Sequence, residues 1–164
     1  MSPQRLRPPD FSELVDVHLL ELPVDVWART QEHTDELLRE FALIASDPAA
    51  SGEVPVRLTH LIEVLTATYS GVGSDQEAQL YAAAEAGQAQ IDDLSFSVPL
   101  ATSEACLVLG ETLDAADEYC RAGQHLLTLA TPDELQRFRR WYLTQFIEQI
   151  AGKAPTPWPA YTGS

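Results

Sequence analysis

The chain has 164 residues, with 25 acidic against 10 basic side chains and a formal charge of −15. Such a field repels nucleic-acid phosphates and anionic lipid surfaces, so we expect neither nucleic-acid binding nor membrane docking. The length suits one domain, and an apolar content of 45% suits a globular core. No apolar run approaches the roughly 20 residues that span a bilayer, and no signal-peptide pattern is seen. We therefore expect a cytoplasmic protein.

Prolines divide the chain into three expected parts. Residues 1–13 contain three prolines and predict a flexible N-terminal arm. Residues 14–152 hold the periodic apolar pattern of a helical domain, and residues 153–164 form a proline-rich C-terminal tail. Alternate prolines in that tail exclude a helix, so we expect an extended strap.

The first two expected helices are amphipathic. Apolar residues recur every three or four positions from Pro23 to Ile44, and a proline suits a first helical turn. A second periodic stretch begins near Pro55 and stops at Gly71. Both patterns predict helices with one buried face.

The middle of the chain combines a third helix with two alternating segments. Ser74 and Glu77 match a capping box, which predicts a helix N-terminus. The expected buried stripe of this helix is Leu80, Ala84, Gly87 and Ile91. Apolar and polar residues alternate at 15–21 and 94–98, as in half-buried strands. The pattern leaves open whether these segments pair or are simply extended.

The fourth expected helix runs from Thr102 to Arg121 and contains both cysteines of the chain, Cys106 and Cys120. At about 1.5 Å per residue, the two lie roughly 21 Å apart along the axis. A disulfide within one continuous helix is excluded at that separation, so we expect reduced thiols.

The last expected helix has the clearest start signal. Thr131 is the predicted N-cap, Pro132 the first helical residue, and Glu134 the partner that closes a capping box. The five helices together predict an all-α fold, a bundle of about five helices around a single core. A minor two-stranded β element is left open by the two alternating segments.

The sequence shows no pattern of a familiar active site. It has no HExxH, paired CxxC, phosphate-binding glycine loop or nucleophile elbow. No histidine follows an acidic residue by three positions, as a di-iron bundle requires. We therefore expect no catalytic residue, no metal site and no cofactor.

One histidine supports an alternative function. The segment 59–64 loosely resembles the motif of histidine phosphotransfer domains, with His60 as phosphoacceptor. Glu63 and Val64 stand where those domains have a lysine and a glycine, and a carboxylate there repels a phosphoryl group. A phosphotransfer bundle is therefore the alternative and not the main prediction.

Aromatic residues suggest a further alternative. Trp27, Trp141 and Tyr142 could line a pocket, which would make the chain a small-ligand sensor. Aromatic residues at helical spacing are more often part of a core. The pattern alone does not decide between the two.

Basic residues cluster on the last expected helix at Arg137, Arg139 and Arg140. In a strongly acidic chain, such a cluster either pairs with nearby carboxylates or offers a docking point for an acidic partner. Both interpretations are consistent with the sequence.

Two groups of segments resemble a known family. The first group is 22–29 with 32–44, and the second is 115–121, 126–134, 138–143 and 155–159. Together they resemble actinobacterial accessory proteins that accompany anti-sigma-factor ATPases and STAS-type antagonists in stress-response partner switching. The resemblance implies an adaptor that binds the anti-sigma ATPase or the STAS protein. It assigns no role to any residue.

The main prediction is therefore a non-enzymatic regulatory or interaction protein. The chain has neither the glycine boxes of an anti-sigma ATPase nor the alternating strands and helices of a STAS domain. A protein is the expected partner, and a homodimer is left open.

Overall fold

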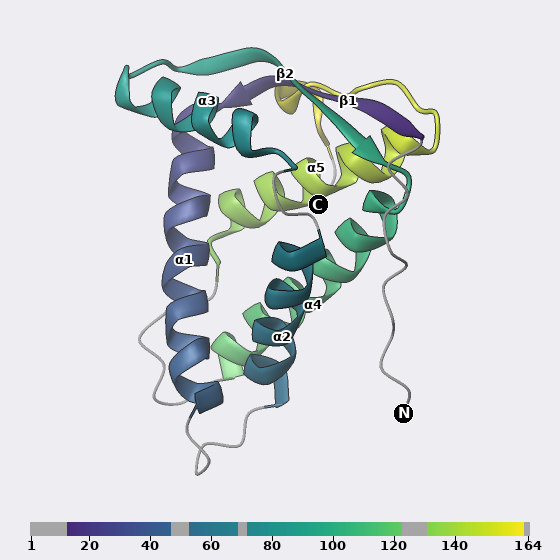
Figure 1. Ribbon diagram of the computed structural model, residues 1–164. Coiled ribbons are helices and arrows are strands. Elements are labelled where there is room, and N and C mark those ends of the chain that lie inside the picture. The colour runs from purple at the N-terminus through teal and green to yellow at the C-terminus, as the bar shows by residue number, and fades with distance from the viewer. Residues whose placement is uncertain (1–12, 47–52, 69–71, 123–130, 163–164) are drawn as a thin grey trace.

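The computed structural model describes residues 13–46, 53–68, 72–122 and 131–162 of the chain. Within them, five α-helices are joined by a two-stranded antiparallel sheet that lies across one end of the helices (Figure 1). The elements are β1 (Leu14–Pro23), α1 (Val24–Ser46), α2 (Glu53–Thr68), α3 (Ser74–Glu85), β2 (Gln90–Pro99), α4 (Thr102–Ala122), α5 (Asp133–Ile150) and a short 3₁₀ helix, η1 (Trp158–Ala160). The prediction of a mainly helical fold with a minor β element is confirmed.

The two alternating segments do pair, over longer strands than the sequence pattern marked. Leu14 lies opposite Pro99, and Pro23 lies opposite Gln90. Glu21 has a left-handed backbone, with φ of +53°. On both strands the buried positions change parity at this point, from Val17 and Leu19 to Leu22 on β1. The local change in twist keeps apolar side chains of both strand halves directed into the core.

The third helix is shorter than predicted, so the expected stripe to Ile91 is wrong. α3 ends at Glu85, and Gly87 adopts φ of +70° in the turn that follows. The chain then enters β2, where Ile91 is a buried strand residue. Gly73 is the N-cap, and the helix itself begins at Ser74. An apolar residue that continues a helical spacing can equally begin a strand, which is why periodicity failed here.

Two apolar clusters replace the predicted single core. The larger one joins the sheet to α5, α3 and the first turns of α1, with Val17, Leu94 and Trp141 at its centre. The smaller one joins the second half of α1 to α2 and α4, around Phe41 and Leu58. Figure 1 shows the reason, since α2 and the later part of α4 lie away from the sheet. α2 and the later part of α4 therefore pack against each other and against α1, and not against the sheet.

Two glutamines of α5 hold the outer segments of the fold. The Gln149 side chain accepts from the His18 amide at 2.8 Å and donates to the His18 carbonyl at 2.8 Å, covering the edge of β1. The Gln145 Oε1 atom accepts from the Thr156 amide at 2.9 Å. The Trp141 indole donates to the Thr156 carbonyl at 2.7 Å. The tail is thus fixed to α5 by paired backbone contacts.

The predicted extended strap is correct only for its first residues. The chain has no regular structure from Lys153 to Pro157 and then forms η1, where the Trp158 ring lies 5.7 Å from the Phe138 and Trp141 rings. The tail therefore packs on the large core. The predicted N-terminal arm lies, except for its last residue, outside the described residues. No described helix has the length and apolar character needed to cross a membrane.

Candidate functional site

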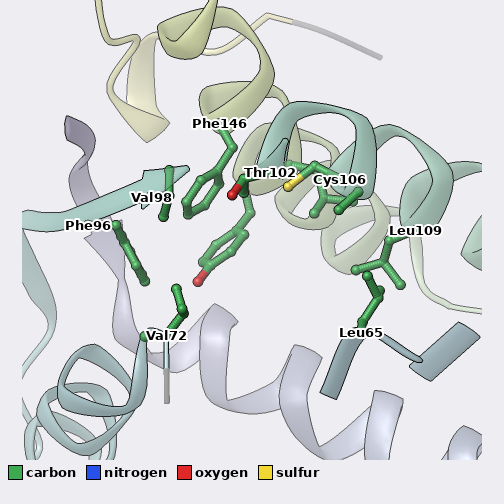
Figure 2. Close-up of a pocket in the computed structure, with 12 residues that line it drawn as sticks. Leu65, Val72, Phe96, Val98, Thr102, Cys106, Leu109 and Phe146 are labelled. Atoms are coloured by element: carbon green, nitrogen blue, oxygen red, sulfur yellow. The ribbon is translucent and has the colours of Figure 1, made fainter. Parts of the chain in front are cut away.

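An apolar pocket of about 220 Å³, partly open at the surface and called the cavity below, lies where the two cores meet. Figure 2 shows Phe96 and Val98 of β2 on one side, Leu65 and Leu109 on the other, and Thr102 and Cys106 of α4 between them. The lining residues are Leu65, Val72, Gly73, Phe96, Val98, Thr102, Ala105, Cys106, Leu109, Tyr142, Leu143 and Phe146. Although α1 contributes to both clusters, the space between them is left incompletely filled.

Local sequence explains how α4 and α5 line this cavity. Thr102, Cys106 and Leu109 recur at spacings of four and three residues, so they share one face of α4. Tyr142 and Phe146 do the same on α5. The Phe146 ring meets Phe96 edge-on at 5.1 Å, which builds an aromatic wall.

Thr102 lines the cavity, but its hydroxyl oxygen is covered by neighbouring protein atoms. Its Oγ1 atom is buried and has no hydrogen-bond partner among the described residues, and the residue is 9% exposed. Threonines within helices usually donate to the carbonyl four residues earlier, as Thr112 does at 2.7 Å. Thr102 is the first residue of α4, and the residue four positions before it belongs to β2. The usual helical acceptor is therefore missing.

Two neutral groups complete the polar lining. Burial raises the pKa of the Cys106 thiol to about 12. Burial also raises the pKa of the Tyr142 phenol, and the nearby Cys106 and Glu77 add to that effect. Both groups stay protonated at neutral pH, and a protonated thiol is a poor nucleophile. The described lining thus presents weak donors and no ionised side chain.

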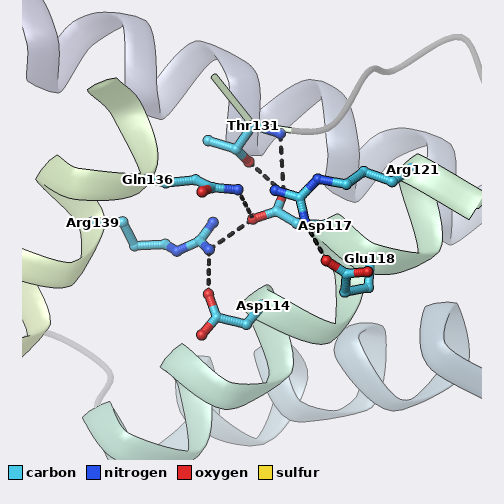
Figure 3. Close-up of polar contacts among 7 residues, drawn as sticks. All are labelled: Asp114, Asp117, Glu118, Arg121, Thr131, Gln136 and Arg139. Atoms are coloured by element: carbon cyan, nitrogen blue, oxygen red, sulfur yellow. Dashed lines mark hydrogen bonds and ion pairs between the residues drawn. The ribbon is translucent and has the colours of Figure 1, made fainter. Parts of the chain in front are cut away.

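A second polar cluster lies near the other end of α4, around Asp117 (Figure 3). This carboxylate is 1% exposed. It accepts from the Thr131 amide at 3.1 Å, the Thr131 hydroxyl at 2.5 Å and the Gln136 amide group at 3.4 Å. The Arg139 guanidinium donates to it at 2.7 Å and to Asp114 at 2.8 Å. The cluster ties the start of α5 to α4.

The ionisation of Asp117 follows from these contacts. Burial alone would raise the pKa of this carboxyl, but the Thr131 hydrogen bonds and the Arg139 charge together hold it below its ordinary value. Asp117 is therefore ionised at neutral pH, which gives the buried Arg139 its counter-ion.

The prediction of Thr131 as the N-cap of the last helix is wrong, because Asp117 binds its hydroxyl. α5 begins at Asp133 with Pro132 as N-cap, and its cap makes no side-chain hydrogen bond. The Thr131 hydroxyl, which a capping box would direct to the helix amides, donates instead to Asp117. A hydrogen bond from the hydroxyl to an ionised carboxylate is stronger than a hydrogen bond between the neutral hydroxyl and a helix amide.

The three arginines proposed for docking have different surroundings. Arg139 has a side chain only 10% exposed and is paired within the chain to α4 carboxylates. Arg137 lies over the Trp158 ring, 4.8 Å from its centre, and donates to the Tyr161 carbonyl. Arg140 is half-buried on α5. Local pairing accounts for Arg139, and docking of an acidic partner stays a prediction.

The other predicted site residues are dispersed. His60 is exposed on α2, and Glu63 is exposed on the same helix, so phosphotransfer stays an untested alternative. Trp141 is fully buried in the large core, and Trp27 is buried in it as well. Of the three aromatic residues suggested as pocket lining, only Tyr142 lines the cavity described above. Among the described residues, no three His, Cys, Asp or Glu side chains cluster as a metal site would require.

Two features escaped sequence reasoning. Asp117 lies four residues after the buried Leu113 and three before the buried Cys120, so its place on the apolar face of α4 could have been noticed. Thr102 offered no such signal, because its isolation depends on the turn between β2 and α4. The cavity itself depends on how the two cores meet.

Comparisons of the chain with protein-family models, with curated proteins and with solved structures give no match. The resemblance to accessory proteins of partner switching therefore stays a prediction from the sequence. The function has to be argued from the cavity and the charges of the chain itself.

Proposed function

We propose that this chain is a non-enzymatic sensor that binds a small, mainly apolar molecule in the cavity between α4, α5 and β2. The observation that carries the proposal is a cavity of about 220 Å³ whose described lining is almost entirely apolar. Engineered apolar cavities of about 150 Å³ stay dry and bind benzene. A natural cavity somewhat larger than that is suited to a small ligand.

The chemistry of the lining supports binding over catalysis. The thiol of Cys106 and the phenol of Tyr142 are both held in their neutral forms by burial. General acid–base catalysis and nucleophilic attack instead need groups that titrate near neutral pH or have an activating neighbour. These neutral groups are suited to binding a ligand reversibly and not to converting it chemically.

The regulatory output that we propose is binding to a protein partner. The cavity is lined by α2 and α4 of the small core together with β2 and α5 of the large one. A ligand that binds one arrangement of these elements more tightly would shift the population toward that arrangement. The sequence resemblance suggests an anti-sigma ATPase or a STAS protein as the partner that responds.

Saturable binding of small aromatic probes tests the proposal. We expect toluene, p-cresol or indole to bind the full chain in calorimetric titrations and to raise its melting temperature. Ala105→Leu adds three carbons at a position that lines the cavity and should abolish binding. Ala84→Leu makes the same change beside a separate hollow next to Trp27 and Tyr81, and should leave binding intact. Absence of saturable binding by all three probes, or equal binding to both variants, would contradict the proposal.

A further inference from the structure

We infer that the outer edge of β2, at residues 93–97, is the docking surface for the protein partner, and that the partner adds an extended segment with basic side chains there as a third strand. This inference rests on the protein partner of the proposed function, and it names the surface and the chemistry that bind it. Two observations lead to it: the direction of the backbone groups along β2 and the charge beside them.

The contacts of His18 show which backbone groups of the sheet point outward. The amide and the carbonyl of His18 both bind the Gln149 side chain, so both point away from β2. In an antiparallel pair, the residue opposite such a position also turns both of its backbone groups away from the partner strand. Ser95 lies opposite His18. Its carbonyl accepts from the Gln76 side chain of α3 at 2.8 Å, which confirms the outward direction.

The same outward direction repeats at every second residue of this part of β2. The register is regular here, with Asp16 opposite Ser97 and Leu20 opposite Asp93. Residues 93, 95 and 97 therefore direct their amides and carbonyls away from β1. The only partner of these groups among the described residues is the Gln76 side chain, which binds one carbonyl. The remaining groups have the alternate spacing that an added strand requires.

The two edges of the sheet differ in how they are covered. On the β1 side, Gln149 is 7% exposed and binds both backbone groups of His18. On the β2 side, Gln76 is only half-buried and binds one carbonyl, and both Ser95 and Ser97 are exposed. An incompletely covered edge is a template for strand addition, in which main-chain hydrogen bonds supply the affinity. Residues 93–97 match the usual strand length of about five residues.

The charge beside this edge selects a basic partner. α3 lies against β2, and the two elements contain acidic residues but no Lys, Arg or His (Figure 1). The acidic residues are Asp75, Glu77, Glu85, Asp92 and Asp93. Lysine or arginine side chains of an added strand would lie close to these carboxylates, which favours binding and steers association. A second copy of the chain would place the same acidic surface against itself, so self-pairing is disfavoured.

A short basic peptide tests the inference on the full chain. The probe is a blocked, fluorescein-labelled peptide that alternates lysine and valine. We expect saturable binding of one peptide per chain, measured by fluorescence anisotropy at about 0.15 M ionic strength, where long-range attraction is screened. The fully N-methylated peptide has the same charge but cannot donate main-chain hydrogen bonds, so its affinity should be at least about 10-fold lower. The peptide that alternates glutamate and valine should not bind.

Variants of α3 and β2 locate the bound peptide. Gln76→Ala removes the side chain that occupies the Ser95 carbonyl, so the lysine–valine peptide should bind about 2- to 10-fold more tightly, the range of one net hydrogen bond. Gln79→Ala changes an exposed glutamine of the same helix and should leave the affinity unchanged. Ser97→Pro removes an outward amide and should weaken binding, whereas Ser97→Ala keeps the amide and should not. Circular dichroism checks that Ser97→Pro is folded, and the other comparisons do not depend on it.

Contrary results would overturn the inference in different ways. Equal affinity of the methylated and unmethylated peptides would reduce the binding to attraction by the acidic surface. An unchanged affinity in Gln76→Ala, or equal binding by a folded Ser97→Pro and by Ser97→Ala, would mean that the peptide lies elsewhere. If sedimentation shows a dimer that Ser97→Pro dissociates, a second copy is the occupant and the basic partner is wrong. If the peptide does not bind while toluene or p-cresol does, this inference fails and the sensor stands.

Discussion

Near its C-terminal end, α4 buries the Asp117 carboxylate with four hydrogen bonds, whereas at its first residue it buries the Thr102 hydroxyl with no partner among the described residues. Both groups lie in the interior of the protein, at 1% and 9% exposure. One carries a full charge, yet it is the better satisfied of the two. Thr131, Gln136 and Arg139 all donate to the Asp117 carboxylate, whereas no described residue bonds to the Thr102 hydroxyl.

The difference separates a satisfied buried group, which holds two helices together, from an unsatisfied one, which holds nothing. A fully satisfied buried network holds elements in a single arrangement, as Asp117 holds the start of α5 against α4. A buried polar group without a partner lowers stability instead. The two ends of one helix therefore make opposite predictions for substitution.

The largest expected effect comes from removing the Asp117 carboxylate. Asp117→Ala leaves the Arg139 guanidinium buried without its closest counter-ion, and it deprives Thr131 of its acceptor. Losing one partner of a buried ion pair typically costs about 3–5 kcal/mol of unfolding free energy. Urea denaturation measures this loss.

Asp114→Ala is the matched control for that variant. Asp114 also binds Arg139, but its side chain is 53% exposed, so water can replace much of the interaction. We expect a loss below about 1 kcal/mol. Equal losses in the two variants would show that burial of Asp117 contributes nothing special.

Acid should remove part of the same stabilisation. The pKa of Asp117 is lower in the folded chain than its ordinary value, so its contribution is fully present above the unfolded pKa of about 3.9. That contribution is lost as the pH falls from there through the folded pKa. The unfolding free energy of the native chain should therefore drop more steeply below about pH 4 than that of Asp117→Asn. Parallel pH profiles for the two proteins would contradict this.

The sequence predicted the helical elements well and their tertiary roles poorly. The helix at 102–121 and the alternation at 94–98 depend on local periodicity, and the structure contains both as α4 and β2. The roles of Thr131 and Ile91 depend on distant partners, Asp117 for one and the paired strand β1 for the other. Local patterns cannot show such partners.

The candidate site was even less predictable. The sequence suggests Tyr142 as pocket lining because it is aromatic, which does not distinguish it from the fully buried Trp141. The cavity arises because the sheet and α5 form one core while α2 and α4 form another. That division depends on tertiary packing, and no spacing in the chain encodes it.

The most direct comparison comes from the same substitution at two threonines. Thr131→Val removes a hydroxyl that donates to a buried carboxylate and should cost about 1–3 kcal/mol of unfolding free energy. Thr102→Val removes a buried hydroxyl that has no partner within the described residues, so it should leave stability unchanged or raise it by about 1 kcal/mol. Thermal and urea unfolding of both variants, without ligand, measure the difference. A loss at Thr102 as large as that at Thr131 would mean that the Thr102 hydroxyl already has a partner in the folded chain.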